Sequence, residues 1–140
     1  MKKIFIFGAG SGSQEVLLAI EQINQLTPTW EVLGFIEKSP ELIGTEINGY
    51  SVYSLENIDL KPITPVHGVC GVLDSKIRQR IIKEEIEGNN ISLATIIHPS
   101  SVVPKGCLIG KGSIIMPFVK ISYDVIIGKG VFVLWNSLLG

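Results

Sequence analysis

The sequence predicts two consecutive architectures: an α/β unit with a parallel sheet over residues 1–95, and an incomplete parallel β-helix over residues 96–140. Two observations support this division. Short apolar strands alternate with amphipathic helices up to about residue 95, and apolar positions then recur every six residues instead of at helical spacing. Strand–helix–strand order with short connections indicates parallel strands joined by right-handed crossovers.

The elements of the first half follow from apolar runs and turn residues. The expected strands cover residues 3–7, 30–36, 47–53 and 66–73, and the expected helices cover residues 13–26 and 74–87. Thr27-Pro28 ends the first helix, and the weak third strand surrounds the turn signal Asn48-Gly49. Asp74 or Ser75 can cap the second helix, which Gly88-Asn89-Asn90 ends.

The second half is defined by its period of six. The aliphatic series is Ile97, Val103, Ile109, Ile115, Ile121, Ile127, Val133 and Leu139. Small or β-branched residues stand four positions after each of the first seven, at Ser101, Cys107, Ser113, Val119, Val125, Val131 and Ser137, and glycine follows at Gly110, Gly128 and Gly140. This spacing predicts a triangular coil with one hexapeptide on each face and the aliphatic side chain inside. Because no coil buries its apolar surface alone, several coils must stack.

Composition and charge exclude several classes of protein. Hydrophobic residues make up 46% of the chain, which favours a repeat structure or an oligomer. A net charge of −1 without a basic stripe argues against nucleic-acid binding. The apolar runs are too short to span a membrane, and glycines follow Met1-Lys2-Lys3-Ile4-Phe5 too soon for a signal peptide, so we expect a cytoplasmic protein. Cys70 and Cys107 lack metal-ligand spacing and are expected to be buried small hydrophobes.

The six-residue series resembles the hexapeptide-repeat acyltransferases, and other segments resemble the sugar O- and N-acyltransferases of the sialic-acid and bacillosamine type. These segments follow the family's order and are Ile4–Gly10, Gly34–Glu37, Ile47–Val52, Asp74–Arg78 and Ile97–Ser100. The resemblance covers the whole chain. It implies a Rossmann-like N-terminal domain that binds a nucleotide-linked sugar, followed by a left-handed parallel β-helix that forms a homotrimer. It also implies acetyl-CoA as co-substrate, bound between neighbouring β-helices.

A glycine-rich loop is the first candidate binding site. Gly8, Gly10 and Gly12 follow the first strand and open the first helix, where backbone amides can cradle phosphate oxygens. Ser13 replaces the last glycine of the dinucleotide-binding pattern, and Ser11 or Ser13 can add a hydroxyl donor. The alternative is a tight turn that packs helix against strand and binds nothing.

Three further residues are candidate substrate contacts. Glu37 ends the second strand, where dinucleotide-binding folds place an acid on a ribose hydroxyl; a solvated loop acid is the alternative. The resembling family has an aspartate there, and Lys38 stands where a second acid is common, which leaves the nucleotide open. Asp74 is expected to cap its helix or contact the sugar, and Arg78 to reach a diphosphate or lie on the helix surface.

Acetyl transfer from a thioester needs a base for the acceptor and a donor for the oxyanion. The resemblance implies a β-helix histidine as the base, and neither His67 nor His98 stands at the matching position. His67 is expected to pack within its strand and His98 to organise the turn between the two halves. The matching position falls just after Gly140, so we expect the chain as given to be interrupted and catalytically inactive, with no metal site.

Two other functions stay open. A non-catalytic module could bind a nucleotide sugar or serve trimerisation alone. An NAD-dependent oxidoreductase is suggested by the glycine loop and Glu37, but about 95 residues are short for a dinucleotide fold, and no second mononucleotide half follows. The choice between O- and N-acetylation is also open.

Overall fold

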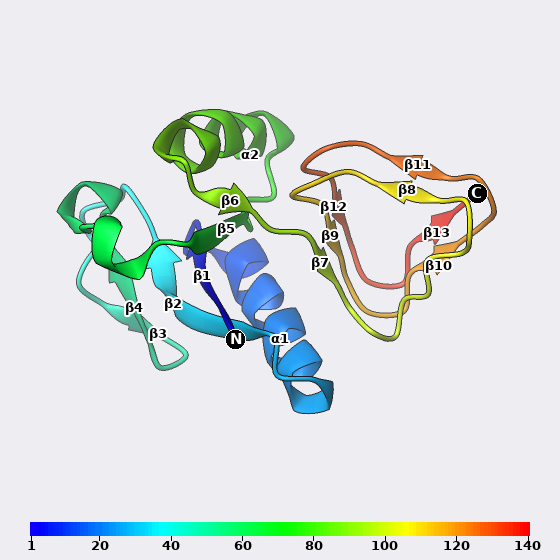
Figure 1. Ribbon diagram of the computed structural model, residues 1–140, viewed down its shortest axis with the longest axis horizontal. Helices are drawn as coiled ribbons and strands as arrows, with labels where there is room; N and C mark the ends of the chain where they lie inside the picture. Colours follow the sequence, from blue (N-terminus) through cyan, green and yellow to red (C-terminus); the bar gives the residue numbers. More distant parts are fainter.

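The computed structural model describes residues 1–140 and contains an α/β unit and a triangular coil that lie side by side (Figure 1). The α/β unit is built on a six-stranded sheet of order β3-β4-β2-β1-β5-β6, parallel except between β3 and β4. Its strands are β1 (Lys2–Phe7), β2 (Trp30–Ile36), β3 (Glu46–Ile47), β4 (Tyr50–Tyr53), β5 (Val66–Cys70) and β6 (Ser92–Leu93). The predicted parallel sheet is confirmed.

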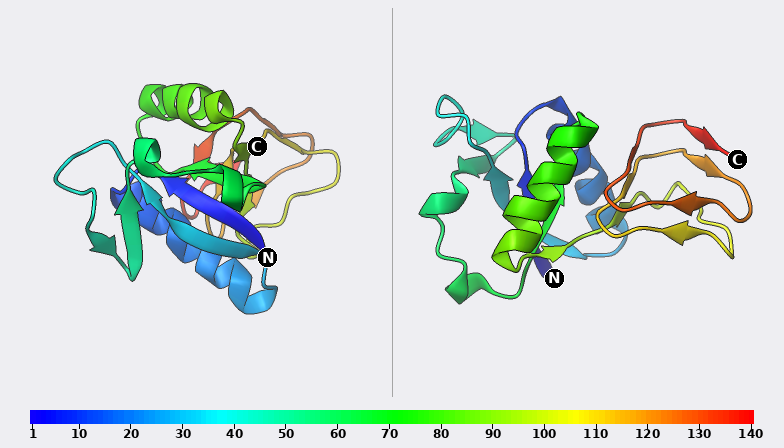
Figure 2. Two further views of the ribbon diagram at one scale, coloured as in Figure 1. Left: turned by 60° about the vertical axis from the view of Figure 1, so that its left-hand side comes forward. Right: turned by 90° about the horizontal axis from the view of Figure 1, so that it is seen from above.

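Helices cover both faces of this sheet (Figure 2). They are α1 (Ser11–Leu26), α2 (Ser75–Ile81), the π-helical segment η3 (Ile82–Ile86), and the short 3₁₀ segments η1 (Leu55–Asn57), η2 (Lys61–Ile63) and η4 (Glu87–Asn89). Successive residues of β1 point to opposite faces. Ile4 and Ile6 join the apolar cluster that includes α1, whereas Phe5 and Phe7 join the cluster that includes α2 and η3.

Local structure departs from the expected elements at three places. The strand expected at residues 47–53 is a hairpin, because Asn48 (φ 50°) and Gly49 (φ 85°) form its two-residue turn. The strand expected at 66–73 ends at Cys70. The helix expected to run to Glu87 is α-helical only to Ile81 and widens to a π-helix over the next five residues.

The coil has three faces of short parallel strands. One face carries β7 (Ile96–Ile97), β9 (Ile114–Ile115) and β12 (Phe132–Val133); the second carries β8 (Leu108–Ile109) and β11 (Ile126–Ile127); the third carries β10 (Lys120–Ile121) and β13 (Leu138–Leu139). Ile97 pairs with Ile115, and Ile115 with Val133, so one turn of the coil takes three hexapeptides. The predicted aliphatic columns are confirmed, since Ile115, Ile127 and Val133 form the centre of the coil's apolar cluster.

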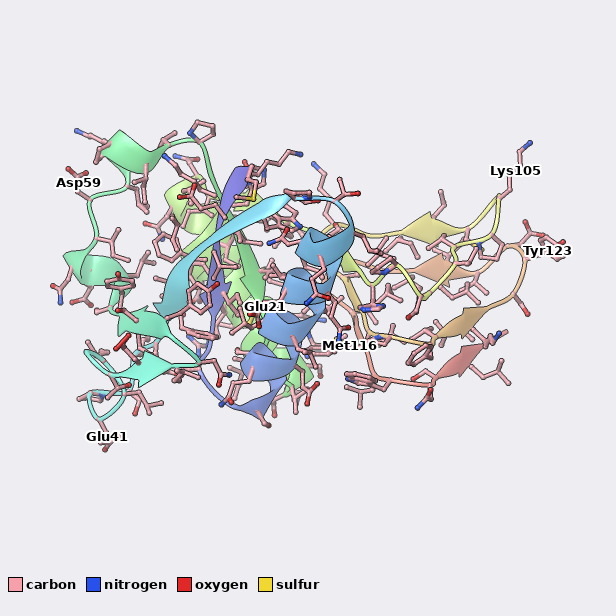
Figure 3. All side chains as sticks on the ribbon, turned by 90° about the horizontal axis from the view of Figure 1, so that it is seen from below. Glu21, Glu41, Asp59, Lys105, Met116 and Tyr123 are labelled. Carbon is pink, nitrogen blue, oxygen red and sulfur yellow. The ribbon has the colours of Figure 1, made fainter.

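The first face of the coil packs against α1. Ile96, Ile114 and Met116 are fully buried and belong to the same apolar cluster as Leu17 and Ile20 of α1. Figure 3 shows Met116 close to α1, while Lys105 and Tyr123 lie at the far end of the coil. The two units therefore share one core. No helix in the structure has the length and apolar character needed to cross a bilayer.

His98 connects the two units by hydrogen bonds, as expected of a residue that organises this turn. Its Nδ1 accepts from the backbone N–H of Ser100 at 3.1 Å, and its Nε2 lies 2.5 Å from Oε1 of Gln22 in α1. Because Nδ1 is an acceptor, the proton of the neutral ring is on Nε2, which donates to Gln22. Ser100 Oγ, 2.7 Å from Nδ1, also accepts from the N–H of Phe118 on the next turn of the coil.

This network predicts a loss of stability in mild acid. Burial lowers the pKa of His98 below its ordinary value of 6.5. The unfolded chain therefore binds a proton more readily than the folded chain. The contribution of neutral His98 is present above about pH 6.5 and is lost as the pH falls through the lower folded-state pKa. Urea unfolding at pH 7.5 and pH 5 is expected to show this loss, and the His98→Asn variant should show a smaller one. An equal pH dependence in both proteins would contradict the assignment.

Candidate functional site

The glycine loop between β1 and α1 contains two glycines that packing requires. Gly8 has a φ of +95°, and a Cβ atom there would lie 2.7 Å from Val72 Cγ2. A Cβ atom on Gly12 would lie 2.2 Å from the carbonyl oxygen of Gly71. At these two positions the close packing of helix against strand is enough to explain the glycine, as the alternative without a ligand predicted. Gly10 differs, because a Cβ atom there would meet no atom within 4 Å.

The N-terminus of α1 is open. Its cap residue, Gly10, offers no side chain, and the first turn contains no acidic residue. The amide of Gln14 bonds to the carbonyl of Gly10 at 3.1 Å, which leaves the amides of residues 11–13 without helical acceptors. These amides and the helix dipole favour an anion at this end. The Ser13 hydroxyl donates to the carbonyl of Phe7 at 3.3 Å and is buried, so the exposed Ser11 is the hydroxyl that remains available.

A pocket lies between the glycine loop and the helices α2 and η3. Its lining consists of Phe7, Gly8, Ile36, Glu37, Lys38, Val72, Ile77, Arg80, Ile81 and Glu85. Glu37 lies in this pocket at the end of β2, as the strand pattern predicted. One of its oxygens, Oε2, accepts from the N–H groups of Lys38 at 2.7 Å and Ser39 at 3.0 Å, and thereby holds its own loop.

Glu85 is a member of this pocket that the sequence did not reveal. It lies on η3 and is only 9% exposed. Its Oε2 is 3.5 Å from Lys38 Nζ and 3.9 Å from Arg80 Nη1. The sequence offered only an acidic pair on an amphipathic helix, a pattern that normally indicates a solvated face.

A second pocket lies where α1 meets the coil. It is lined by Ser11, Gly12, Glu15, Leu73, Met116, Phe132, Leu134 and Trp135. Trp135 Nε1 donates to Glu15 Oε2 at 3.1 Å, which fixes the carboxylate beside an apolar wall. Neither residue was predicted, because they are 120 positions apart and neither belongs to a local motif.

Asp74 performs the capping role that was one of its two expected roles. Its Oδ1 accepts from the backbone N–H groups of Lys76 and Ile77, each at 3.0 Å, at the start of α2. It does not line either pocket.

Arg78 lies at the junction of the two units and not on the helix surface. It is 6% exposed. Its Nε donates to the carbonyl of Gly130 in the coil at 2.8 Å, and its Nη1 donates to the carbonyls of Val72 and Leu73 at 2.9 Å. The guanidinium also lies over Phe132, 6.0 Å from the ring centroid. The expectation that Arg78 lies on the helix surface is therefore wrong. Its bonds to the three carbonyls also engage most of the donors that a diphosphate would need.

The remaining reactive side chains are in structural positions. His67 packs edge-on against Trp30, with ring centroids 5.4 Å apart, and neither histidine lines the two pockets. Burial raises the pKa of the Cys70 thiol to about 11, which keeps it protonated and unreactive at neutral pH. Cys107 is only partly buried, contrary to expectation. No three His, Cys, Asp or Glu side chains gather as a metal site.

The chain is similar in sequence and in fold to several known proteins. Residues 1–92 match the family described as C2185-like, N-terminal. The GDP-perosamine N-acetyltransferase of Escherichia coli O157:H7 is 36% identical over 125 residues, which are 89% of this chain and 55% of that protein.

Two solved structures share the fold. PerB from Caulobacter crescentus, in complex with CoA and GDP-perosamine, superposes with a TM-score of 0.83 at 20% identity, over 99% of this chain and 63% of that one. The acetyltransferase domain of PglB from Neisseria gonorrhoeae, in complex with acetyl coenzyme A, superposes with a TM-score of 0.78 at 23% identity, over 99% and 64% of the two chains. The chain thus spans between about half and two thirds of the length of these relatives. The resemblance to sugar acyltransferases is confirmed.

Proposed function

The chain belongs to the C2185-like, N-terminal family, and we propose that it binds the nucleotide-linked amino sugar of an acetyl-CoA-dependent sugar N-acetyltransferase in glycan biosynthesis. The observation that carries the proposal is the open N-terminus of α1. One pocket adjoins the glycine loop at Gly8, and the other adjoins it at Ser11 and Gly12. A relative named as a GDP-perosamine N-acetyltransferase and a similar fold solved with CoA and GDP-perosamine support this choice of substrate.

The proposal assigns a role to each part of the site. The α/β unit acts as a Rossmann-like domain, and the amides of residues 11–13 with the Ser11 hydroxyl bind the diphosphate. The nucleoside occupies the pocket beside Gly8. There the second oxygen of Glu37, which accepts no hydrogen bond within the protein, is free to accept from a ribose hydroxyl. The sugar extends into the pocket at the coil, between Glu15 and Trp135.

The chemistry required there is attack of a sugar amine on a thioester carbonyl. The new C–N bond forms as the C–S bond breaks, the amine loses a proton to a base, and CoA leaves as the thiol. Glu15, held by Trp135, is the one carboxylate in this pocket and can orient the acceptor amine. We assign neither histidine as the base, because His67 packs on Trp30 and both ring nitrogens of His98 are bonded.

The coil, which we take to be left-handed, is proposed to associate as a homotrimer with acetyl-CoA between neighbouring coils. Apolar side chains on the two faces directed away from the α/β unit support association. Leu108 is 63% exposed, Ile126 75% and Leu138 80%. Leu108 and Ile126 are neighbours in one ladder, and exposed apolar surface of this kind commonly marks a protein–protein interface.

A binding experiment on Gly10 tests the proposal. A Cβ atom at Gly10 meets open space, so the Gly10→Val variant should fold, with the loss of about 1 kcal/mol that is typical of an apolar residue at a helix N-cap. Its isopropyl group would occupy the approach to the α1 amides. We expect calorimetry to show binding of a GDP-linked amino sugar to the parent chain, and at least about tenfold weaker binding to the variant.

Acetyl-CoA and NADH serve as parallel ligands, and thermal unfolding of both proteins is the control for folding. Binding of NADH without binding of the nucleotide sugar would contradict the proposal and favour an oxidoreductase. Unchanged nucleotide-sugar affinity in Gly10→Val would remove the helix N-terminus from the site.

A further inference from the structure

We propose that the pocket beside Gly8 selects guanine nucleotides and that Glu85 is the residue that recognises the base. This inference rests on the proposed function, since it takes the pocket as the nucleoside site. It adds the residue that recognises the base, which the choice of a GDP-linked ligand does not assign.

The carboxylate of Glu85 is nearly buried and lacks hydrogen-bond donors from the protein. Glu85 is 9% exposed, yet its carboxylate accepts no hydrogen bond from the protein. The nearest cationic nitrogens, on Lys38 and Arg80, are at 3.5 Å and 3.9 Å. Charge-assisted N–H···O bonds are shorter, about 2.7–2.9 Å. A nearly buried carboxylate with open acceptor positions can therefore bind donors supplied by a ligand.

The position of Glu85 is set by a π-helical turn. The widened helix turn at η3 places it in the pocket that Gly8 lines, together with the apolar side chains of Ile77 and Ile81. π-helical turns of this kind occur frequently at functional sites. Glu37 in the same pocket accepts two backbone N–H groups with one oxygen. Glu85 accepts no hydrogen bond, and its two cationic neighbours both lie near Oε2, which leaves Oε1 without a polar partner.

The Glu85 carboxylate is complementary to one edge of guanine. Guanine presents two adjacent donors, N1–H and N2–H₂, beside the O6 acceptor. A carboxylate can accept both donors, and a neighbouring Arg80 or Lys38 can donate to O6. Uracil presents a single N–H between two carbonyl oxygens, which would face the carboxylate as like partial charges. The arrangement of one carboxylate beside two cations therefore fits guanine and disfavours uracil.

The test compares nucleoside diphosphates by calorimetry. The chain is titrated with GDP, UDP and IDP, the last of which lacks only the 2-amino group of guanine. We expect GDP to bind about tenfold or more tightly than either, since a bidentate contact to a base gives discrimination of this order. Glu85→Gln should reduce the affinity for GDP toward that for IDP and leave UDP little changed. Glu84→Gln is the matched control, because Glu84 is an exposed neighbour that also pairs with Arg80 and does not line the pocket.

The outcomes separate this inference from the proposed function. Equal or tighter binding of UDP would overturn guanine selection while nucleotide binding stands. Equal affinities of the parent chain for GDP and IDP would overturn the role of Glu85, whether or not the Glu85→Gln variant folds. Absence of binding by all three nucleotides would overturn the proposed function and this inference with it.

Discussion

Replacing Gly110 with alanine is expected to destabilise the fold by about 3 kcal/mol, at the upper end of the range for overpacking. The added methyl group would lie 2.4 Å from the carbonyl carbon and oxygen of Gly128 and 2.6 Å from the amide nitrogen of Lys129. These are backbone atoms of the next turn of the coil. Because they are fixed by the parallel ladders, they cannot move aside as the end of a side chain could.

The coil contains its own control for this prediction. Gly128 occupies the same place in the six-residue pattern, but a Cβ atom there would meet only Val131 Cγ2, at 4.0 Å. Gly128→Ala is therefore expected to change stability by no more than about 0.5 kcal/mol. Guanidinium unfolding followed by circular dichroism measures both variants. Similar losses for the two would show that the approach of Gly110 to Gly128 does not limit stacking.

The second large effect is expected at Arg78. Arg78→Met keeps much of the apolar stem but removes the donors to the carbonyls of Gly130, Val72 and Leu73. Leaving buried acceptors unpaired costs about 1–3 kcal/mol each before relaxation, so we expect a loss of about 3 kcal/mol. Arg78→Lys should recover only part of this loss, since an ammonium cannot reproduce the planar fork of the guanidinium.

The measurement for Arg78 also distinguishes its structural role at the junction from the diphosphate contact that the sequence suggested. Unfolding of each variant is followed by denaturant titration, and nucleotide affinity is measured on the folded protein. A structural residue predicts a large loss of stability with little change in nucleotide affinity. Unchanged stability with a large loss of affinity would instead restore the diphosphate contact that the sequence suggested.

Local patterns predicted most of the fold. The six-residue series predicted the coil because every aliphatic position must enter one narrow interior, as Ile115 and Ile127 do. Asp74 was a predictable cap, since its side chain needs only the next turn of backbone. The paired apolar residues Ile96-Ile97 and Ile114-Ile115 also indicated that these strands are buried on both sides. One residue of each pair enters the coil, and the other faces the α/β unit.

The site was predicted less completely, because its contacts join distant positions. The Arg78–Gly130 bond spans 52 residues, and nothing local in either segment indicates it. The sequence placed Glu37 correctly at the end of a strand, but the hydrogen bonds to its own loop are specific to the conformation of residues 37–39. Glu85 could not be predicted, because the expected α-helix becomes a π-helix at Ile82, and this changes which residues face the pocket.

The shared core has a consequence for how the coil unfolds. In repeat proteins each turn is stabilised mainly by its neighbours, so unfolding can begin at either end. Here the face that carries Ile96, Ile114 and Met116 is anchored in the core of the α/β unit. Amide hydrogen exchange should therefore be slowest in β7 and β9 and should become faster toward β13, with distance from this anchored face. The pocket between Glu15 and Trp135 joins α1 to the turn that follows β12, partway along this gradient. The shape of this pocket can therefore change when a partner packs on the outer turns of the coil, while the nucleotide pocket stays rigid.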